Sequence, residues 1–346
     1  MSTPVAGSAV DLAWTTALPK VELHCHIEGT MRAATVAELA SRNGIDFPVA
    51  DPRDLYSYAN LTEFLDVFWL VQSVLVLPED WERLAFESVV DAAGAGVVYR
   101  EAFFTPARHL LAGQRLEEIV AALDRGLETG ERETGARCRL IFDIDRSYGP
   151  GPALEQVEEL VSLRSVEAKG MERVIGVGMD STELGVEPAA FAHSYALAAS
   201  AGLRRTAHQG ENSPASAIAT ALDVLGCERI DHGISILGDA NLVKRAVDMR
   251  LPLTVCPRAN IRINPDVCAD LKDHVFPELR RAGLLAMLNT DDPGLTDLDL
   301  ASEYLAVATC FGYDRADLVA MAIDAVDASW APEDEKRELR RLVVAV

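Results

Sequence analysis

The stretch that decides the fold is KVELHCHIEGT, residues 20–30. Apolar and polar side chains alternate along it, which is typical of a β-strand with two different faces. His24 and His26 are therefore expected on the same face, and Gly29 is expected to end the strand. Two imidazoles at the end of a strand suit a divalent transition metal. A pair of polar residues on a solvated strand face is the alternative at this point, because His-x-His alone is a weak signal.

Seven further segments have a strand pattern, and most of them end in polar or ionisable residues. They cover residues 97–104, 137–145, 174–180, 203–208, 229–232, 252–256 and 284–289. Helical patterns separate them, at residues 116–133, 153–169, 188–201, 215–225, 239–249 and in the segment that leads to Arg281. Alternating strands and helices predict parallel strands with crossover connections. Eight such units predict an α/β fold of the TIM type, a closed (β/α)8 barrel. An open doubly wound sheet is the alternative, but no Gly-x-Gly-x-x-Gly follows the first strand.

Extra helices are predicted around this barrel. Residues 33–42 are expected to form a helix that Asn43-Gly44 ends, and residues 301–346 are expected to form C-terminal helices on the outside. Residues 1–19 are expected to be a loose arm. Because the sequence contains no linker, internal repeat or low-complexity tract, residues 1–346 are predicted to form a single domain.

An aromatic helix is predicted over residues 61–77, after the first strand. Leu61, Phe64, Leu65 and Phe68 follow the spacing of one helical face and form an apolar stripe. Taken alone, this stripe is typical of core packing.

Composition limits the classes of partner and compartment. The formal net charge of -22 would repel phosphate backbones and anionic lipids, so neither a nucleic-acid polymer nor a membrane is expected as a partner. The six cysteines show no Cys-x-x-Cys spacing, and the first nineteen residues lack the pattern of a signal peptide. The sequence therefore predicts reduced thiols in the cytoplasm. It does not predict an oligomeric state.

Ionisable residues at the strand ends form a candidate catalytic set. His24, His26, His208 and Asp291 could meet at one end of a barrel, where three imidazoles and a carboxylate would bind zinc and leave a position for water. Zinc makes such a water nucleophilic near neutral pH. Glu211 would serve as general acid and base, and His232 would orient or deprotonate the water. Asp292 would accept a hydrogen bond from the substrate.

The remaining histidines carry weaker signals. His109 lies several residues beyond a strand and is an unassigned candidate for the pocket. His193 and His274 lie in helix or loop patterns and are predicted to be structural or exposed.

The chain resembles the adenosine/adenine deaminase family of metal-dependent amidohydrolases. The segments that carry the resemblance occur in the family's order and cover about residues 19 to 300: VELHCHIEGT (21–30), YREAFF (99–104), GMDSTE (178–183), TAHQGE (206–211), RIDHG (229–233), LTVCP (253–257) and NTDDP (289–293). The resemblance implies one zinc in a (β/α)8 barrel and hydrolytic removal of a purine 6-amino group.

The resemblance also implies a role for each residue of the set. His24, His26, His208 and Asp291 would be the metal ligands. Glu211 would protonate the purine N1, His232 would position the nucleophile and Asp292 would hold N7. The stripe on residues 61–77 would be an apolar lid over the pocket, rather than core.

The substrate is expected to be free adenine, which would give hypoxanthine and ammonia. Adenosine deaminases usually carry Asp at the position of Glu28 and Gly at that of Glu183, and both glutamates would reduce the room beyond the purine ring. Glu183 would accept the N9–H of the free base, although it could instead cap the following turn. Gln209 and residues 294–299 depart from the family pattern and leave alternatives: adenosine, an N6-substituted adenine, or a larger 6-aminopurine nucleoside such as aminodeoxyfutalosine.

Three other readings are weaker. A binuclear amidohydrolase usually has a bridging lysine at the end of the fourth strand, but this strand ends in Met179-Asp180. A cytidine-type zinc deaminase would carry Pro-Cys-x-x-Cys, which is absent. A non-catalytic metal-binding barrel is the third alternative, and the acid at Glu211 argues against it.

Overall fold

The strands form a curled parallel sheet. The computed structural model describes residues 9–265 and 268–345, without the side chain of Leu61, so the predictions for residues 1–8 and for that side chain lie outside the description. Five strands lie in the order β1-β2-β3-β4-β5 and four in the order β6-β7-β8-β9, and all neighbours are parallel. Their bounds are β1 Lys20–Glu22, β2 Val97–Phe104, β3 Arg137–Asp145, β4 Val174–Asp180, β5 Arg204–Arg205, β6 His208–Gln209, β7 Ile230–His232, β8 Pro252–Val255 and β9 Leu285–Leu288.

Two seams close these strands into a barrel. At the first, β5 and β6 are halves of one run of chain: Thr206 N donates to Val177 O (3.0 Å) on one side, and Ala207 O accepts from Asp231 N (3.0 Å) on the other. At the second, a parallel bridge joins Cys25 to Asp291, beyond the ends of β1 and β9. The nine strands therefore occupy eight barrel positions, and the predicted (β/α)8 fold is confirmed.

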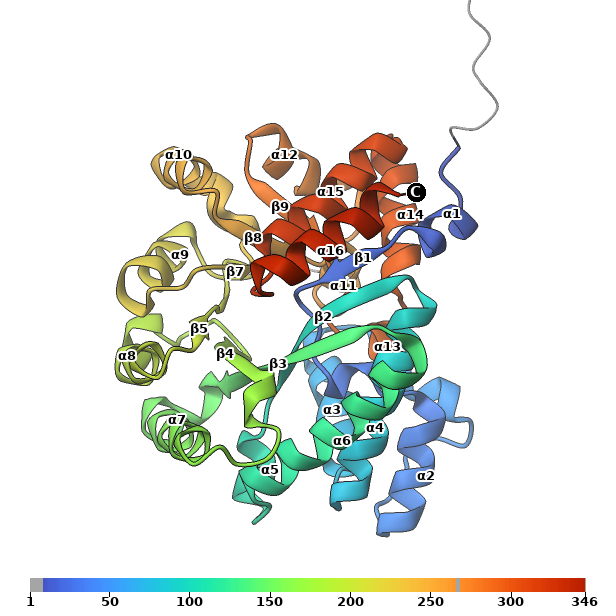
Figure 1. Cartoon of the computed structure of the whole chain (residues 1–346), viewed down its shortest axis with the longest axis vertical. Coiled ribbons are helices and arrows are strands. Elements are labelled where there is room, and N and C mark those ends of the chain that lie inside the picture. The colour runs from blue at the N-terminus through green and yellow to red at the C-terminus, as the bar shows by residue number, and fades with distance from the viewer. Residues whose placement is uncertain (1–8, 266–267, 346) are drawn as a thin grey trace, which may run out of the picture.

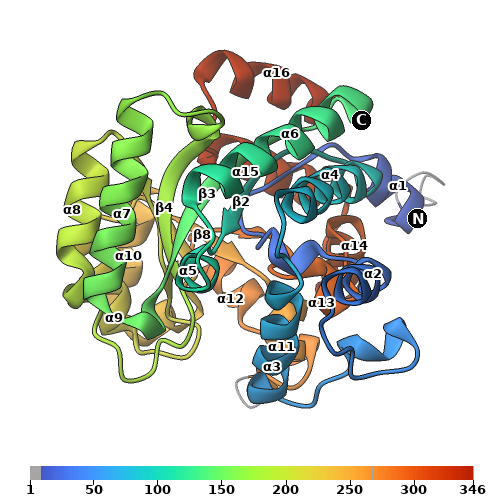
Figure 2. The ribbon, with the colours of Figure 1, turned by 90° about the horizontal axis from the view of Figure 1, so that it is seen from below.

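Helices surround the strands (Figure 1). Their bounds are α1 Leu12–Ala17, α2 Ala33–Asn43, α3 Leu61–Ser73, α4 Pro78–Gly94, α5 Ala107–Leu111, α6 Leu116–Thr134, α7 Pro150–Ser165, α8 Ala192–Ser200, α9 Ala215–Thr220, α10 Ala240–Met249, α11 Pro257–Ile263, α12 Phe276–Arg281, α13 Pro293–Thr296, α14 Leu300–Phe311, α15 Arg315–Ala328 and α16 Glu333–Val344. In Figure 2, α16 lies at one end of the barrel and α3 at the opposite end.

Several predicted boundaries need correction. The first strand is regular only over Lys20–Glu22, and a 3-10 turn forms at Glu28–Thr30. The aromatic helix ends at Ser73, and a separate helix, α4, begins at Pro78, for which the sequence analysis has no counterpart. The expected loose arm contains α1, whose N-terminus is capped by the Asp11 carboxylate accepting from Trp14 N (2.8 Å).

The strands are buried on both faces, and this explains why their sequences are apolar runs. Every residue of β1, and all but one of β2, is buried, because the barrel interior covers one face of each strand and the helices cover the other. Helix α2 ends at Gly44, whose φ of 68° is left-handed, as Asn43-Gly44 predicts.

A buried ion pair lies near the N-terminal ends of the strands. Arg229 Nη1 donates to Glu101 Oε2 (2.6 Å), and both side chains are fully buried. The Trp330 ring lies 4.0 Å from the Arg229 guanidinium carbon, and Trp330 N donates to the other oxygen of Glu101 (2.5 Å). The segment between α15 and α16 therefore packs against this end of the barrel.

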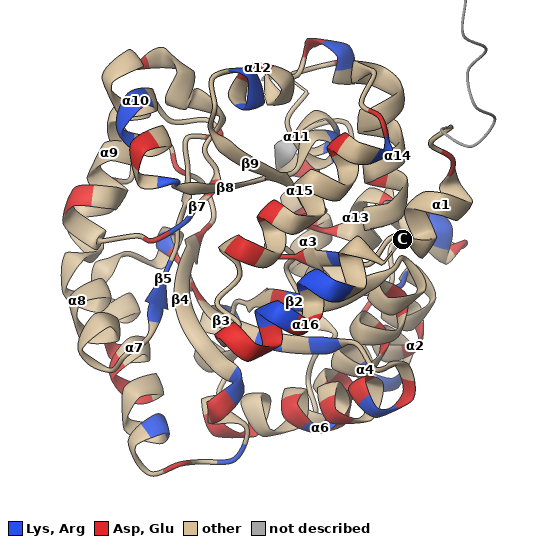
Figure 3. Cartoon of the chain, turned by 45° about the horizontal axis from the view of Figure 1, so that its top comes forward, with Lys and Arg blue, Asp and Glu red and all other residues tan. Residues whose placement is uncertain are grey.

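The expected absence of nucleic-acid and membrane partners stays a prediction. Acidic and basic residues are mixed over the outer helices (Figure 3). All six cysteines are free thiols. Among the described residues, no helix is both long and apolar enough to cross a bilayer. The cytoplasmic location and the single-domain organisation stay predictions.

Replacing Glu101 with Ala should destabilise the barrel strongly. The change leaves the Arg229 guanidinium buried without its carboxylate, which costs roughly 3–5 kcal/mol of the free energy of unfolding. Urea unfolding followed by circular dichroism measures this. Glu338→Ala is the control, because it removes an exposed partner of Arg137 and should cost at most about 1 kcal/mol. An equal loss of the free energy of unfolding in the two variants would show that the buried pair contributes no more than an exposed one.

Candidate active site

Four predicted ligands converge at the C-terminal ends of the strands. The donor atoms of His24, His26, His208 and Asp291 all lie within 4.8 Å of one another, and all four residues are buried. His26 Nε2 lies 3.0 Å from His208 Nε2, and His24 Nε2 lies 3.1 Å from Asp291 Oδ1. The structure therefore brings together the set that the sequence singled out.

Hydrogen bonds at Nδ1 orient two of the three rings, those of His24 and His208, so that each turns Nε2 inward. His24 Nδ1 lies 3.1 Å from Thr254 O, and His208 Nδ1 lies 3.2 Å from Met179 O, so each can donate to a backbone carbonyl. His26 Nδ1 faces the Asp143 carboxylate at 3.7 Å. Such contacts fix the tautomer of a metal-binding histidine.

The donor set fits a divalent metal. With both Nδ1 atoms bound to carbonyls, the Nε2 atoms of His24 and His208 are lone-pair acceptors, and they face a third imidazole nitrogen and a carboxylate. A group of acceptors this close is satisfied by a cation between them. Three imidazoles and a carboxylate are the ligand types of zinc-like metals.

Three of the six described non-glycine residues with positive φ lie at the C-terminal ends of β4, β7 and β9 or just beyond them. Ser181, His232 and Asp291 have positive φ values of 71°, 61° and 64°. Left-handed backbone at residues other than glycine costs of order 1–3 kcal/mol and clusters at functional sites. The strands therefore end in conformations that aim side chains inward at an energetic cost.

A small cavity of about 110 Å³ opens on the cluster. It is much smaller than the roughly 300–1,000 Å³ of most small-molecule sites. Phe64, Leu65 and Phe68 line it; the two phenyl rings stack with centroids 5.9 Å apart, and Phe68 meets the edge of His26 at 6.5 Å. The apolar stripe is thus a wall of the cavity, and its action as a lid stays a prediction.

Glu211 and His232 lie beside the cluster and line the same cavity. His232 Nε2 lies 4.0 Å from Glu211 Oε2. Burial raises the pKa of the Glu211 carboxyl above its ordinary value, which favours a group that can hold a proton. Asn260 Nδ2 donates to Glu211 Oε1 (2.7 Å) and lies 3.1 Å from His232 Nδ1.

Asp292 presents a free oxygen at the cavity. Its Oδ1 is buried and has no hydrogen-bond partner within the described residues. A Cβ on Gly29 would lie 1.9 Å from that oxygen. Gly29 therefore makes room for the Asp292 carboxyl, whereas its predicted role in ending the strand is wrong, because β1 ends at Glu22. Burial and the neighbouring Asp291 raise the pKa of Asp292 well above its ordinary value.

The structure does not bring Glu183 into the cavity, in contrast to the expected contact with substrate. Its carboxylate is buried and accepts hydrogen bonds from Gly210 N (2.7 Å), Glu211 N (3.0 Å) and Gln209 Nε2 (3.0 Å), as well as from the Ser213 hydroxyl. The side chain is long enough to reach the backbone of the loop that follows β6, and that loop takes both oxygens. Glu183 thus holds the loop that carries Glu211.

Glu28 lies behind the cavity wall. Its Oε1 accepts from Thr105 N (2.8 Å), and Thr105 itself lines the cavity. Glu28 is fully buried, so it shapes the wall from behind and does not contact the space directly. Neither Glu28 nor Glu183 is among the described residues that line the cavity, and their contacts with a substrate stay predictions.

His109 does not line the cavity. It lies in α5, where its ring meets the edge of Trp81 with centroids 4.6 Å apart. Burial lowers the pKa of His109 to about 4. Its packing is therefore structural. His193 lies in α8 and is exposed, as predicted.

Sequence reasoning missed several residues around the site. Asp143 lies near the end of β3 and Asp180 ends β4, and with His26 they form a second close group of possible donors. Asn260 contacts both Glu211 and His232 but lies in helix α11, where no strand-end signal marks it.

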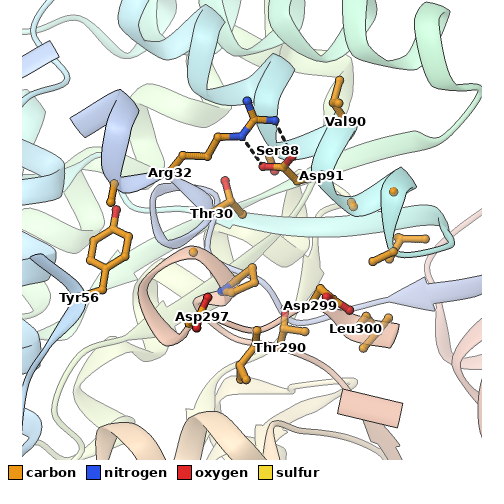
Figure 4. Close-up of a pocket in the computed structure, with 18 of the residues that line it drawn as sticks. Thr30, Arg32, Tyr56, Ser88, Val90, Asp91, Thr290, Asp297, Asp299 and Leu300 are labelled. Atoms are coloured by element: carbon orange, nitrogen blue, oxygen red, sulfur yellow. Dashed lines mark hydrogen bonds and ion pairs between the residues drawn. The ribbon is translucent and has the colours of Figure 1, made fainter. Parts of the chain in front are cut away.

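A larger cavity of about 820 Å³ lies elsewhere, between the segments at Thr30–Ala33, Ser88–Val97 and Thr290–Leu300 (Figure 4). Two of its arginines are paired with carboxylates: Arg32 with Asp91 (2.5 Å) and Arg100 with Glu22 (2.6 Å). Among the described residues that line it, none has a buried polar atom without a partner. It therefore lacks the free polar groups that the smaller cavity has.

Comparisons with known proteins place this geometry among the deaminases. The adenosine deaminase family profile matches residues 19–346. An adenine deaminase of Streptomyces coelicolor is 38% identical over 330 residues, which are 94% of this chain and 94% of that protein. The crystal structure of adenine deaminase from Arthrobacter aurescens superimposes with a TM-score of 0.89 at 35% identity, covering 95% of this chain and 99% of the other. An amidohydrolase from Burkhoderia ambifaria with bound Zn gives 0.87 at 29% identity, covering 99% and 94%.

Removal of metal should lower the melting temperature by several degrees. A ligand that binds only the folded chain adds about 2.7 kcal/mol of stability at one hundred times its Kd, and the cluster exists only in the folded chain. Calorimetry before and after chelation, followed by addition of divalent metal, measures the shift. The melting temperature of His24→Ala should change little on chelation. That of His193→Ala, which alters an exposed helix residue, should change as much as that of the wild type. A wild type indifferent to metal would contradict the assignment.

Proposed function

The chain belongs to the adenosine deaminase family, and from that premise we propose that it hydrolyses adenine to hypoxanthine and ammonia. The observation that carries the proposal is the Glu211 carboxyl beside four convergent metal-ligand side chains in one small cavity. A barrel that only binds metal would not require a buried acid with a raised pKa at this place.

We propose that the cluster holds a single zinc ion. His26 belongs to two groups of possible donors, one with Asp291 and the other with Asp143 and Asp180. If His26 Nε2 binds the metal, a neutral ring keeps its proton on Nδ1, which faces Asp143. The second group then supports the first instead of binding another cation. A zinc ion held there supplies a Lewis acid that makes water nucleophilic near neutral pH.

Glu211 acts as the general acid. It lies in the cavity wall, where its proton can pass to N1 of a bound purine and make C6 more electrophilic. Burial raises the pKa of this carboxyl and so supports a protonated form at the start of the reaction. When water adds to C6 and the C6–N bond breaks, one proton of the water returns to Glu211 and the other leaves with the 6-amino group as ammonia, so that C6 becomes the carbonyl carbon of hypoxanthine.

His232 and Asp292 orient the reactants. His232 Nε2 faces the cavity from the end of β7 and orients the attacking water. Purine N7 is a hydrogen-bond acceptor, so Asp292 must be protonated and donate to it, in contrast to the acceptor role expected from the sequence. The raised pKa of the buried Asp292 carboxyl supports that state.

The apolar wall excludes water from the reaction. Phe64, Leu65 and Phe68 cover the cavity on the side of α3. Charge that develops on the ring in the transition state is stabilised more strongly by Glu211 and His232 in a site without bulk water.

The free base fits the cavity better than a nucleoside. A volume of about 110 Å³ gives a ribose little room beside the purine. The wall, with Glu28 behind Thr105, therefore limits substrate size by shape. Glu183 contributes by holding the loop that carries Glu211.

Glu211→Gln should nearly abolish turnover while metal content and fold persist. An amide cannot give its proton to N1, and general acid–base catalysis contributes about 10²–10⁴ in rate. Loss of adenine absorbance with ammonia release measures kcat. Glu187→Gln is the control, because Glu187 is an exposed residue of the β4–α8 connection, and it should keep full activity. If Glu211→Gln retained more than about a tenth of kcat, the role would be misassigned.

The wild type should prefer adenine over adenosine by roughly 10–200-fold in kcat/KM, because shape alone supplies roughly 1–3 kcal/mol of discrimination. Glu183→Gln should lower kcat on both substrates about tenfold and leave their ratio unchanged, because an amide cannot accept from all the donors of the loop. Steady-state kinetics with both substrates measure this. A wild type that prefers adenosine would contradict the proposal, and a ratio that moved in the variant would restore Glu183 as the discriminator.

A further inference from the structure

Two residues outside the cavity wall connect to both candidate catalytic groups. We propose that His274 fixes the orientation of the Asn260 amide, so that both amide hydrogens point at Glu211 and His232. Asn260 and His274 would then be positioning residues for the proposed deamination, and the inference rests on that proposed function. Both side chains are almost fully buried.

The chain of hydrogen bonds starts at a backbone amide. Phe276 N donates to His274 Nδ1 (3.1 Å), so the neutral ring carries its proton on Nε2. Burial lowers the pKa of His274 to about 4, and the ring therefore stays neutral near pH 7. Its Nε2–H points at Asn260 Oδ1, 3.3 Å away. His274 can thus act only as a donor to Asn260.

This donor fixes the amide. With Oδ1 accepting from His274, the amide nitrogen faces the active site, and its two hydrogens can serve Glu211 Oε1 at 2.7 Å and His232 Nδ1 at 3.1 Å. A half-turn of the amide would set its oxygen against the Glu211 carboxylate and its NH2 against the His274 N–H. Buried polar groups left without partners make that arrangement unfavourable.

The fixed amide has consequences for both catalytic groups. Because His232 Nδ1 accepts a hydrogen bond, the neutral His232 ring holds its proton on Nε2, the nitrogen that lies 4.0 Å from Glu211 Oε2. Because Glu211 Oε1 also accepts, the proton destined for the purine resides on Oε2. One amide therefore selects the reactive atom on each side chain.

Nitrogen-15 spectra of the zinc-loaded, histidine-labelled enzyme test the arrangement without any substrate. His232 and His274 should each show a protonated Nε2 and an unprotonated Nδ1, with signals assigned through single His→Gln variants. In His274→Phe, which removes the donor, the His232 signals should shift toward a mixture of tautomers. A proton on His232 Nδ1, or on both of its nitrogens, in the wild type would overturn the inference.

Kinetics on the same proteins supply the second readout. His274→Phe should lower kcat for adenine about tenfold with KM nearly unchanged, whereas His274→Gln, whose amide can donate to Asn260 Oδ1, should restore most of it. Asn260→Asp, which lacks the NH2, should lose about 100-fold. His193→Gln is the matched control on an exposed helix, and metal content and melting temperature are checked for every variant.

The outcomes separate the two proposals. Equal kcat in His274→Phe and His274→Gln would overturn the positioning role. If His274→Phe does not fold, the wild-type spectra and Asn260→Asp still decide the question. A wild type with the expected His232 tautomer but no activity on adenine would support the network and reject the proposed substrate.

Discussion

The hydrogen bonds that close the barrel are made by the residues that form its reactive centre. His26 N donates to Asp291 O (2.8 Å), and Asp291 N donates to His24 O (3.2 Å), across the seam between the ends of β1 and β9. The side chains of the same three residues converge on the candidate metal position. The geometry of the cluster is therefore set by backbone pairing, and a metal bound there would connect the first and last strands of the sheet.

Around this seam, two of the imidazoles and the end of β1 have hydrogen-bond partners outside the cavity. Thr254 and Met179 offer carbonyls to two of the imidazoles, and Asn289 Oδ1 accepts from Leu23 N and His24 N, which fixes the end of β1. Glu183 holds the loop after β6. Such contacts keep the groups in place before a substrate arrives, so that little reorganisation is needed during the reaction.

The barrel and its reactive end could be predicted because two sequence signals coincide. The strands are buried on both faces and read as apolar runs, and their polar ends share one rim of the barrel. These two signals together predicted that His24, His208 and Asp291 lie at that rim. Helices α1 and α4 were missed, since each lies outside the alternation of strand and helix. The contacts of Asn260 and the direction of Glu183 could not be predicted from periodicity. They depend on how helix α11 and the loop after β6 pack in space.

The position of Trp330 bears on how the chain is made. Trp330 N donates to Glu101, 229 positions earlier, and His24 N donates to Asn289, 265 positions away. Contacts of such long range form late and slow the search for the native state. During synthesis, β1 to β5 emerge first, with the edges of β1 and β5 unpaired, and such edges invite association with other chains. The barrel therefore cannot close until the strands that follow β5 have been made, because the bridge from Cys25 to Asp291 joins the first strand to the last.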